Sequence, residues 1–270
     1  MRPARVTDEV GAGGAGGGRL APVLLVAHGS GDPRAARATE ALTRAVAAAR
    51  PGLPVRASYL DHGPPRPGAV LAELEAAGHR SAVLVPLLLT AAYHGRVDIP
   101  GAVAVAREAG LRIPVRSAEV LGPTAGVVDP RLLAGLLRRL AEAVGAATPA
   151  DGGVDGLVLA AAGTRDAAAR DTVVQVAEAL GRTTGLPTRV GYASAAPPTA
   201  GAAVGALRAA GARRVAVATY FLAPGRLCDT ALGSAREAGA VALADPLGDA
   251  PELVRLVLGR VDAAVSGDSR

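Results

Sequence analysis

The sequence predicts an α/β protein with two doubly wound parallel sheets in tandem, and three observations carry this prediction. Short apolar runs rich in Val and Leu alternate along the chain with longer segments of helical spacing. The alternation extends over 270 residues, enough for two domains that each bury a core. The second half of the chain also repeats the first. Strands that alternate with helices in this way form parallel sheets with helices on both faces.

Local signals place the elements of the first half. Asp is a favoured N-cap and proline fits the first helical turn, so we expect the first helix to begin at Asp32-Pro33 and to end at Pro51-Gly52. Short apolar runs that end in turn residues are expected as strands, and segments with apolar residues every three or four positions as helices. The expected strands are 23–27, 55–60, 81–89 and 115–118, and the expected helices are 33–49, 70–77, 101–109 and 130–144.

The second half repeats the first at an offset of about 133 residues, which indicates an internal duplication. Residues 157–164 match residues 24–30, and residues 207–222 match residues 74–89, with a shared Ala-Ala-Gly. A stretch rich in Ala, Gly, Pro and Asp separates the copies. We expect a disordered tail over 1–20, a first domain over 21–147, a linker over 148–156, a second domain over 157–264 and a tail over 265–270.

The duplication does not keep the polar residues at the strand ends. Ala162 stands in place of His28, and Ala193 or a neighbour stands in place of Asp61. All four histidines of the chain lie in the first half. We therefore expect one functional site in the first half, with the second half supplying a wall.

Composition and charge exclude several classes of protein. The formal net charge of +5 comes from arginine alone, and the absence of a basic run and of an aromatic platform argues against nucleic-acid binding. No apolar run reaches the roughly 18 to 20 residues of a membrane span. The N-terminal residues have no apolar core typical of a secretory signal. A single cysteine, Cys228, excludes a disulfide framework and a cysteine-built zinc site, so we expect a cytoplasmic protein.

Histidines and a carboxylate follow three successive strands of the first half. His28 ends the first strand, Asp61 and His62 follow the second, and His94 follows the third. The carboxyl edge of a parallel sheet is where open α/β folds bind ligands, so these side chains could converge there. Two imidazoles and a carboxylate suit iron, cobalt, nickel or zinc better than magnesium or calcium, and a neutral imidazole can also accept a proton near pH 7.

Ordinary structural roles remain open for each of these residues. A histidine at a strand end is often only a hydrogen-bonding loop residue, and His94 could take part in turn capping between Tyr93 and Asp98. Adjacent residues of an extended segment point in opposite directions, so one of Asp61 and His62 is expected to face away. The glycines around Ser30 lack the spacing of a P-loop or of a dinucleotide fingerprint, which argues against a nucleotide site.

Three motifs follow the strands of the first half: Ala27-His28-Gly29-Ser30, Tyr59-Leu60-Asp61, and Pro86-Leu87-Leu88-Leu89-Thr90-Ala91-Ala92 followed by His94 and Asp98-Ile99-Pro100. These motifs resemble those of the class II chelatases of tetrapyrrole biosynthesis, the sirohydrochlorin cobaltochelatases and ferrochelatases, in a two-domain single-chain form. The resemblance covers most of residues 21–147. In that family two flavodoxin-like halves, from one chain or from a homodimer, face each other across a cleft that holds the macrocycle.

The resemblance implies a metal site and a set of substrate contacts. His28 and His94 are implied as metal ligands and proton acceptors, with Asp61 as third ligand and His62 as its substitute. Asp61 is one methylene shorter than the glutamate common in the family, and Tyr93 is an extra residue before His94. The candidate contacts to the macrocycle are Ser30, Arg34, Tyr93, Arg96, Arg165 and Arg226.

The resemblance implies ATP-independent insertion of Fe²⁺ or Co²⁺ into sirohydrochlorin, towards sirohaem or cobalamin. The metal ion is then a substrate, Ni²⁺ or Zn²⁺ could replace it in vitro, and no organic cofactor is implied. A non-catalytic carrier of metal or tetrapyrrole is the alternative. A hydrolase or isomerase is less favoured, since no Ser-His-Asp or Cys-His spacing is evident. A monomer is expected, because one chain already holds both halves.

Overall fold

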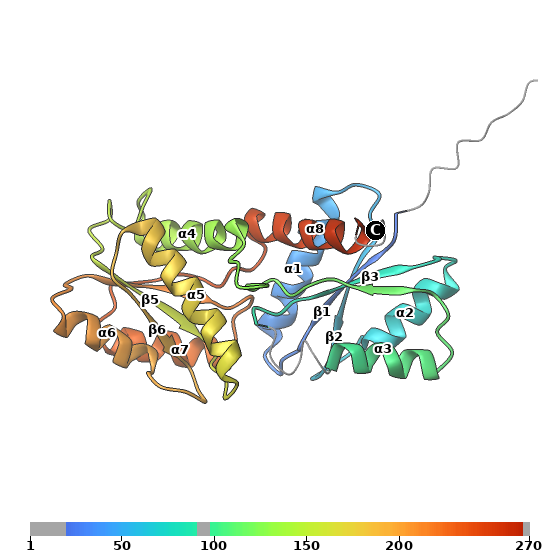
Figure 1. Ribbon diagram of the computed structural model, residues 1–270, viewed down its shortest axis with the longest axis horizontal. Coiled ribbons are helices and arrows are strands. Elements are labelled where there is room, and N and C mark those ends of the chain that lie inside the picture. The colour runs from blue at the N-terminus through green and yellow to red at the C-terminus, as the bar shows by residue number, and fades with distance from the viewer. Residues whose placement is uncertain (1–19, 91–97, 267–270) are drawn as a thin grey trace, which may run out of the picture.

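Two four-stranded parallel sheets form the framework of the molecule, which the computed structural model describes for residues 20–90 and 98–266 (Figure 1). The strand order is β2-β1-β3-β4 in the first sheet and β6-β5-β7-β8 in the second. Both halves therefore have the same topology, and the α/β class with duplicated parallel sheets is confirmed. The tail expected over 1–20 lies outside the described residues except for Leu20, and so do residues 267–270.

Strands and helices alternate from one end of the described chain to the other. The elements of the first half are β1 (Val23–Ala27), α1 (Pro33–Ala49), β2 (Val55–Tyr59), α2 (Pro67–Ala76), β3 (Ala82–Pro86), α3 (Ile99–Glu108), β4 (Val115–Ser117) and α4 (Pro130–Val144). Those of the second half are β5 (Gly156–Ala161), α5 (Ala167–Thr184), β6 (Thr188–Tyr192), α6 (Ala200–Ala209), β7 (Val215–Tyr220), α7 (Arg226–Glu237), β8 (Ala242–Leu243) and α8 (Pro251–Ser266).

The helix boundaries follow from N-caps that the sequence carries. Asp32 caps α1 by accepting a hydrogen bond from the backbone N–H of Arg34, and Asp129 caps α4 in the same way. Strand β3 ends at Pro86, whereas the sequence predicted a strand that extends to Leu89. The last three residues of that apolar run lie beyond the end of the strand. None of the described helices has the length and apolarity that a membrane crossing requires.

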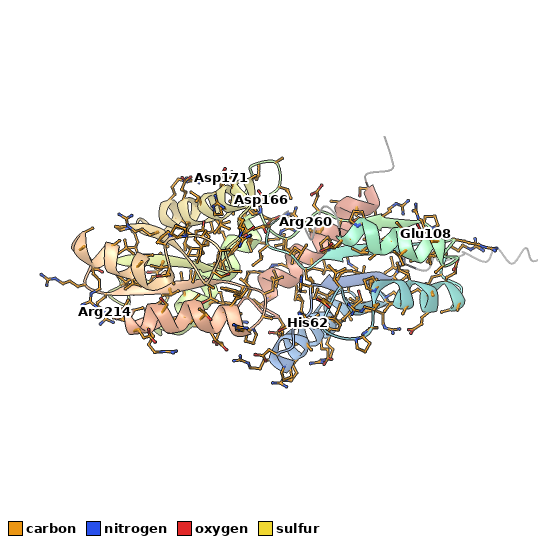
Figure 2. All side chains as sticks on the ribbon, turned by 90° about the horizontal axis from the view of Figure 1, so that it is seen from below. His62, Glu108, Asp166, Asp171, Arg214 and Arg260 are labelled. Atoms are coloured by element: carbon orange, nitrogen blue, oxygen red, sulfur yellow. The ribbon has the colours of Figure 1, made fainter. Side chains whose placement is uncertain are left out.

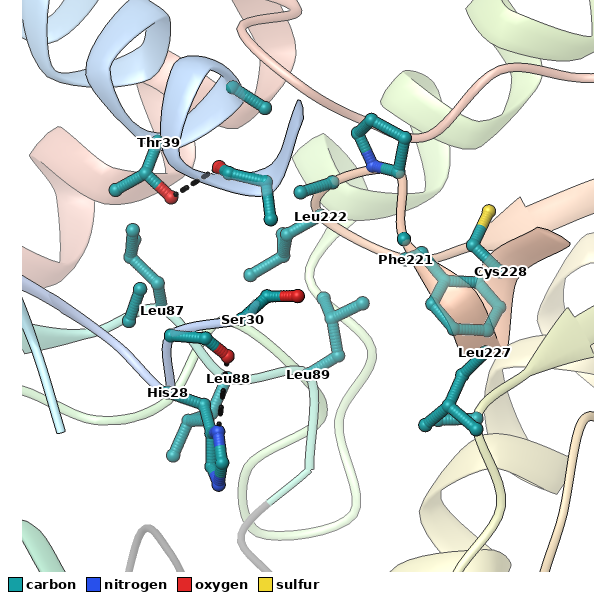
Figure 3. Close-up of a pocket in the computed structure, with 18 of the residues that line it drawn as sticks. His28, Ser30, Thr39, Leu87, Leu88, Leu89, Phe221, Leu222, Leu227 and Cys228 are labelled. Carbon is teal, nitrogen blue, oxygen red and sulfur yellow. Dashed lines mark hydrogen bonds between the residues drawn. The ribbon is translucent and has the colours of Figure 1, made fainter. Parts of the chain in front are cut away.

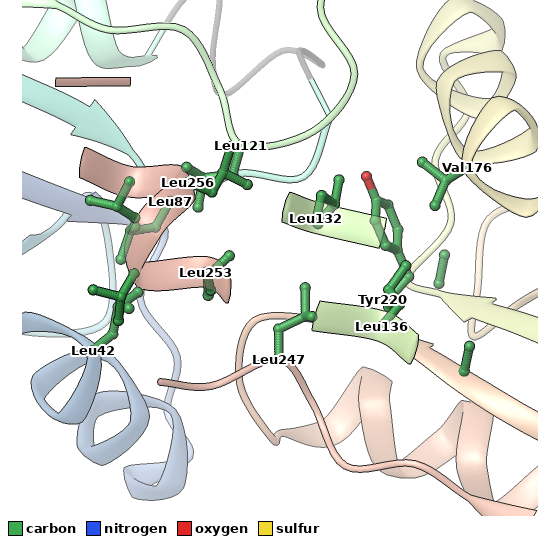
Figure 4. Close-up of a cluster of buried hydrophobic side chains, with 14 of the residues drawn as sticks. Leu42, Leu87, Leu121, Leu132, Leu136, Val176, Tyr220, Leu247, Leu253 and Leu256 are labelled. Carbon is green, nitrogen blue, oxygen red and sulfur yellow. The ribbon is translucent and has the colours of Figure 1, made fainter. Parts of the chain in front are cut away.

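The two halves exchange their last helices. Helix α4 follows the first sheet in the chain but packs on β7 and β8 of the second, whereas α8 packs on α1, β3 and β4 of the first half (Figure 1). One hydrophobic core consequently spans both halves (Figure 4). In it, Leu132 and Leu136 of α4 lie in the same cluster as Tyr220, and Leu256 of α8 lies near Leu87. The two halves defined by the sequence repeat therefore differ from the two packed units of the molecule, because each unit contains the last helix of the other half.

Polar contacts fasten α8 to the first half. Arg260 donates to the carbonyl oxygen of Val120 at 2.9 Å and lies where the two halves meet (Figure 2). Glu252, only 5% exposed, accepts two hydrogen bonds from Arg138 of α4 at 2.7 and 2.8 Å and a third from Arg255 at 3.0 Å. The Arg138 guanidinium lowers the pKa of Glu252 from 4.5 to about 2. The ion pair thus joins the two exchanged helices.

We expect Arg138→Met to lower the free energy of unfolding at pH 7 by more than the loss of an exposed ion pair does, because it leaves the buried Glu252 carboxylate with Arg255 as its only guanidinium partner among the described residues. The folded-state pKa of Glu252 is depressed, so the stability it contributes is present above about pH 4.5 and is lost as the pH falls towards 2. The difference between the two proteins should therefore shrink between pH 5 and pH 2. Urea unfolding at a series of pH values measures it.

Arg182→Met is the matched control for this prediction. Arg182 pairs with Glu178 at 3.7 Å on α5, and both side chains are well exposed. Exposed pairs of this kind contribute little, so the control should change the free energy of unfolding by less than about 0.5 kcal/mol at any pH. Equal effects of the two substitutions would contradict a special role for the Arg138–Glu252 pair.

Candidate functional site

A cleft of about 490 Å³ lies between the two halves, at the carboxyl ends of their strands. The turns after β1 and β5, the segments after β3 and β7, and one face of α1 line it (Figure 3). His28, Asp61 and His62 belong to the lining on the side of the first half. The cleft therefore lies at the edge of the sheet where the sequence predicts the site.

The turn after β1 is held tightly against the end of β2. Gly29 has a φ of +96°, and a Cβ atom there would lie 2.0 Å from the carbonyl oxygen of Asp61. The backbone N–H of Asp61 donates to the carbonyl oxygen of His28 at 2.7 Å. The half-buried His28 ring has its Nδ1 3.2 Å from the carbonyl oxygen of Gly29. Glycine is required here, and the backbone of His28 is fixed relative to Asp61.

His28, Asp61 and His62 gather on one side of the cleft. The ring centroids of the two histidines are 6.2 Å apart, and Nε2 of His62 lies 3.8 Å from Oδ2 of Asp61. The expectation that one of Asp61 and His62 faces away differs from the structure, because His62 has a φ of +61° and does not continue the extended chain. The hydrogen bond from the His62 N–H, and next the charge of its imidazole, hold the pKa of Asp61 below its usual range. Asp61 is therefore a carboxylate at neutral pH.

The second half keeps the same turn without these side chains. Gly163 has a φ of +88°, a Cβ there would lie 2.0 Å from the carbonyl oxygen of Ser194, and the N–H of Ser194 donates to the carbonyl oxygen of Ala162. Ala195 has a φ of +62°, as His62 has. Ser194, and not Ala193, is thus the counterpart of Asp61. The backbone of this turn needs no imidazole.

Three residues of the expected site fall outside the described part of the chain. These are His94, Tyr93 and Arg96. Within residues 20–90 and 98–266, no group of three His, Cys, Asp or Glu side chains is placed to hold a metal ion. A metal site that includes His94 therefore stays a prediction.

The expected substrate contacts do not all reach the cleft. Ser30 lines it, and its Oγ also accepts a hydrogen bond from the N–H of Asp32 at 3.0 Å. Arg226, exposed at the start of α7, lines it as well. Arg34 pairs with Asp32 and, across the two halves, with Asp229, at 2.5 Å each. Arg165 is exposed and does not belong to the lining.

Two residues of the cleft were not expected from the sequence. The hydroxyl of Tyr220 donates to the carbonyl oxygen of Leu89 at 2.8 Å, which ties the end of β7 to the first half, and burial raises the pKa of that hydroxyl. Cys228 is buried in the lining, and burial raises the pKa of its thiol to about 12, so it is a neutral thiol at physiological pH. The sequence could have pointed to Tyr220, because aromatic residues are rare in this chain and this one lies at the end of a strand.

Comparisons with known proteins agree with this architecture. SirB from Bacillus subtilis with Fe³⁺ superimposes with a TM-score of 0.75 at 19% identity, covering 92% of this chain and 97% of that one. The sirohydrochlorin chelatase SirB from B. subtilis subspecies spizizenii in complex with cobalt gives a TM-score of 0.74 at 19% identity over the same shares. CbiX, described as the terminal enzyme of sirohaem biosynthesis in denitrifying bacteria, gives 0.64 at 24% identity, covering 90% and 99%.

The similarity to these structures shows a shared fold. A search of curated proteins finds no significant match. The sequence model of the CbiX family matches twice, over residues 22–143 and 156–264, one match in each half. The chain belongs to the CbiX family, with two copies of the family unit in tandem.

Proposed function

We propose that the protein is a sirohydrochlorin chelatase that inserts Fe²⁺ or Co²⁺ into its tetrapyrrole substrate. One observation carries this proposal. The two halves share the turn at the cleft, but His28, Asp61 and His62 occupy it in the first half alone, where the second has Ala162, Ser194 and Ala195. Membership of the CbiX family supports the same activity.

Metal insertion into a tetrapyrrole requires three steps at such a site. Water must be removed from the ion, the ion must be held near the macrocycle, and two pyrrole N–H protons must leave. A site with few protein ligands can hold the ion and still release it, whereas a closed four-ligand site would retain it. We assign metal binding and proton acceptance to His28 and His94, with Asp61, or His62 in its place, as third ligand. The exposed Asp61 and His62 leave the site open to ions from solvent.

Arginine side chains are the proposed partners of the substrate's carboxylates, of which sirohydrochlorin has eight. Arg226 is the first candidate because it lines the cleft. At Arg34 a substrate carboxylate would compete with Asp229 for the guanidinium. Arg96 and Arg165 complete the proposed set, with Ser30 and Tyr93 as further contacts. Neither ATP nor an organic cofactor takes part in this proposal.

The activity is tested with purified protein, sirohydrochlorin and each metal ion under anaerobic conditions, followed by absorbance. We expect insertion faster than in buffer over many turnovers, with Fe²⁺ or Co²⁺ preferred and Ni²⁺ or Zn²⁺ accepted more slowly. Stoichiometric binding without turnover would indicate a metal or tetrapyrrole carrier instead. Insertion no faster than in buffer would exclude the proposed activity.

A further inference from the structure

Aromatic side chains are rare in this chain and concentrate at the cleft. The sequence has four tyrosines, one phenylalanine and no tryptophan. Tyr59, Tyr192, Tyr220 and Phe221 all line the cleft, and the fifth aromatic residue, Tyr93, lies outside the described residues. The three lining tyrosines are at most 9% exposed, whereas Phe221 is half-buried. Among the described residues, Phe221 is therefore the aromatic ring that the cleft leaves accessible.

The duplication places Phe221 where the first half has a leucine. The N–H of Leu121 donates to the carbonyl oxygen of Leu88, and the N–H of Leu247 donates to that of Phe221, each at 2.9 Å. Leu88 and Phe221 thus occupy equivalent positions after β3 and β7. The ring of Phe221 and the side chain of Leu227 lie together on one side of the cleft, and His28 and Leu88 lie on the other (Figure 3).

The backbone on both sides of Phe221 is fixed. Tyr220, its neighbour, is buried and hydrogen-bonded to the carbonyl oxygen of Leu89, and the carbonyl oxygen of Phe221 itself is paired with Leu247. A ring on a fixed backbone loses little conformational freedom when a ligand covers it, so more of the stacking energy is available for binding.

We propose that Phe221, with Leu227 beside it, is the stacking surface for one face of the macrocycle and holds that macrocycle against the side of the cleft that carries His28. This inference rests on the proposed function and adds a contact from the half without histidines. A flat conjugated ligand stacks on an aromatic ring in an offset arrangement, which a leucine cannot provide. The first half thus supplies the proposed metal ligands, and the second half adds a stacking contact to the macrocycle.

The test is Phe221→Leu, which installs the residue that the first half has at the same position. We expect the KM for sirohydrochlorin to rise about three- to tenfold while the KM for the metal ion stays within twofold. The Kd for sirohydrochlorin without metal, measured by absorbance titration, should rise by the same factor. Phe221→Tyr keeps the ring and should retain a KM and a Kd within about twofold of wild type.

Several outcomes separate this proposal from the proposed function. A sirohydrochlorin KM unchanged in Phe221→Leu, or equal rises in both KM values, would overturn the stacking surface. A wild-type protein that binds sirohydrochlorin without inserting metal would refute the chelatase activity, and the metal-free Kd of the two variants would still test the stacking. The melting temperatures of both variants show whether a change in KM comes from a loss of folded protein.

Discussion

His28→Ala should abolish metal insertion while it changes the free energy of unfolding by less than about 1 kcal/mol. The activity should be lost because the substitution removes an imidazole that we assign to metal binding and proton acceptance. Stability should be kept because Ala162 occupies the equivalent position of a turn with the same backbone geometry. Anaerobic insertion assays and urea unfolding of the same preparations measure the two effects.

His79→Ala is the matched histidine control for this prediction. His79 is half-buried after the end of α2 and does not belong to the lining of the cleft. Its removal should leave the rate of insertion unchanged. A loss of several kcal/mol in His28→Ala would assign His28 to the scaffold instead, and full activity in that variant would place the metal chemistry elsewhere.

Gly29→Ala and Gly163→Ala should each lower the free energy of unfolding by about 2 to 4 kcal/mol. Both glycines have a positive φ, and a Cβ atom at either would lie 2.0 Å from a backbone carbonyl oxygen. Relief of that overlap requires the turn to move away from Asp61 in one half and from Ser194 in the other. Thermal or urea unfolding of the two variants measures this decrease in the free energy of unfolding.

The two glycine variants should differ in activity even though they are matched in strain. Gly29→Ala separates His28 from Asp61, so the folded protein should lose most of its insertion activity, whereas Gly163→Ala should keep insertion within about threefold of wild type. Assays at low temperature, corrected for the folded fraction, make the comparison. Equal losses in both variants would show that the turn of the second half takes part in the reaction.

Much of the fold followed from patterns within single segments. Buried apolar strands, capped helices and an internal repeat are local or periodic signals, and they predicted two parallel sheets of one topology. The exchange of α4 and α8 could not be predicted in the same way. An amphipathic helix shows in its sequence that one face is buried, but not which of two similar sheets buries it.

The sequence predicted those parts of the candidate site that lie at strand ends. It did not predict the parts that depend on the conformation of a turn or on a partner far away in the sequence. His28 and Asp61 meet because parallel strands end at one edge, and the sequence shows both ends. The inward position of His62 depends on a left-handed backbone angle, for which histidine has no strong local signal. The pairing of Arg34 with Asp229 joins residues 195 positions apart and belongs to no repeat or motif.

The exchanged helices give the half without histidines a structural role in the half that carries them. A shortened gene that encoded only residues 20–147 would lack α8, and Leu87 and the face of β3 would lose the cover that α8 provides. The same product would contain α4 but would lack β7 and β8, the strands on which α4 packs. Each half therefore completes the other, and the half without histidines supports the fold of the half that carries them.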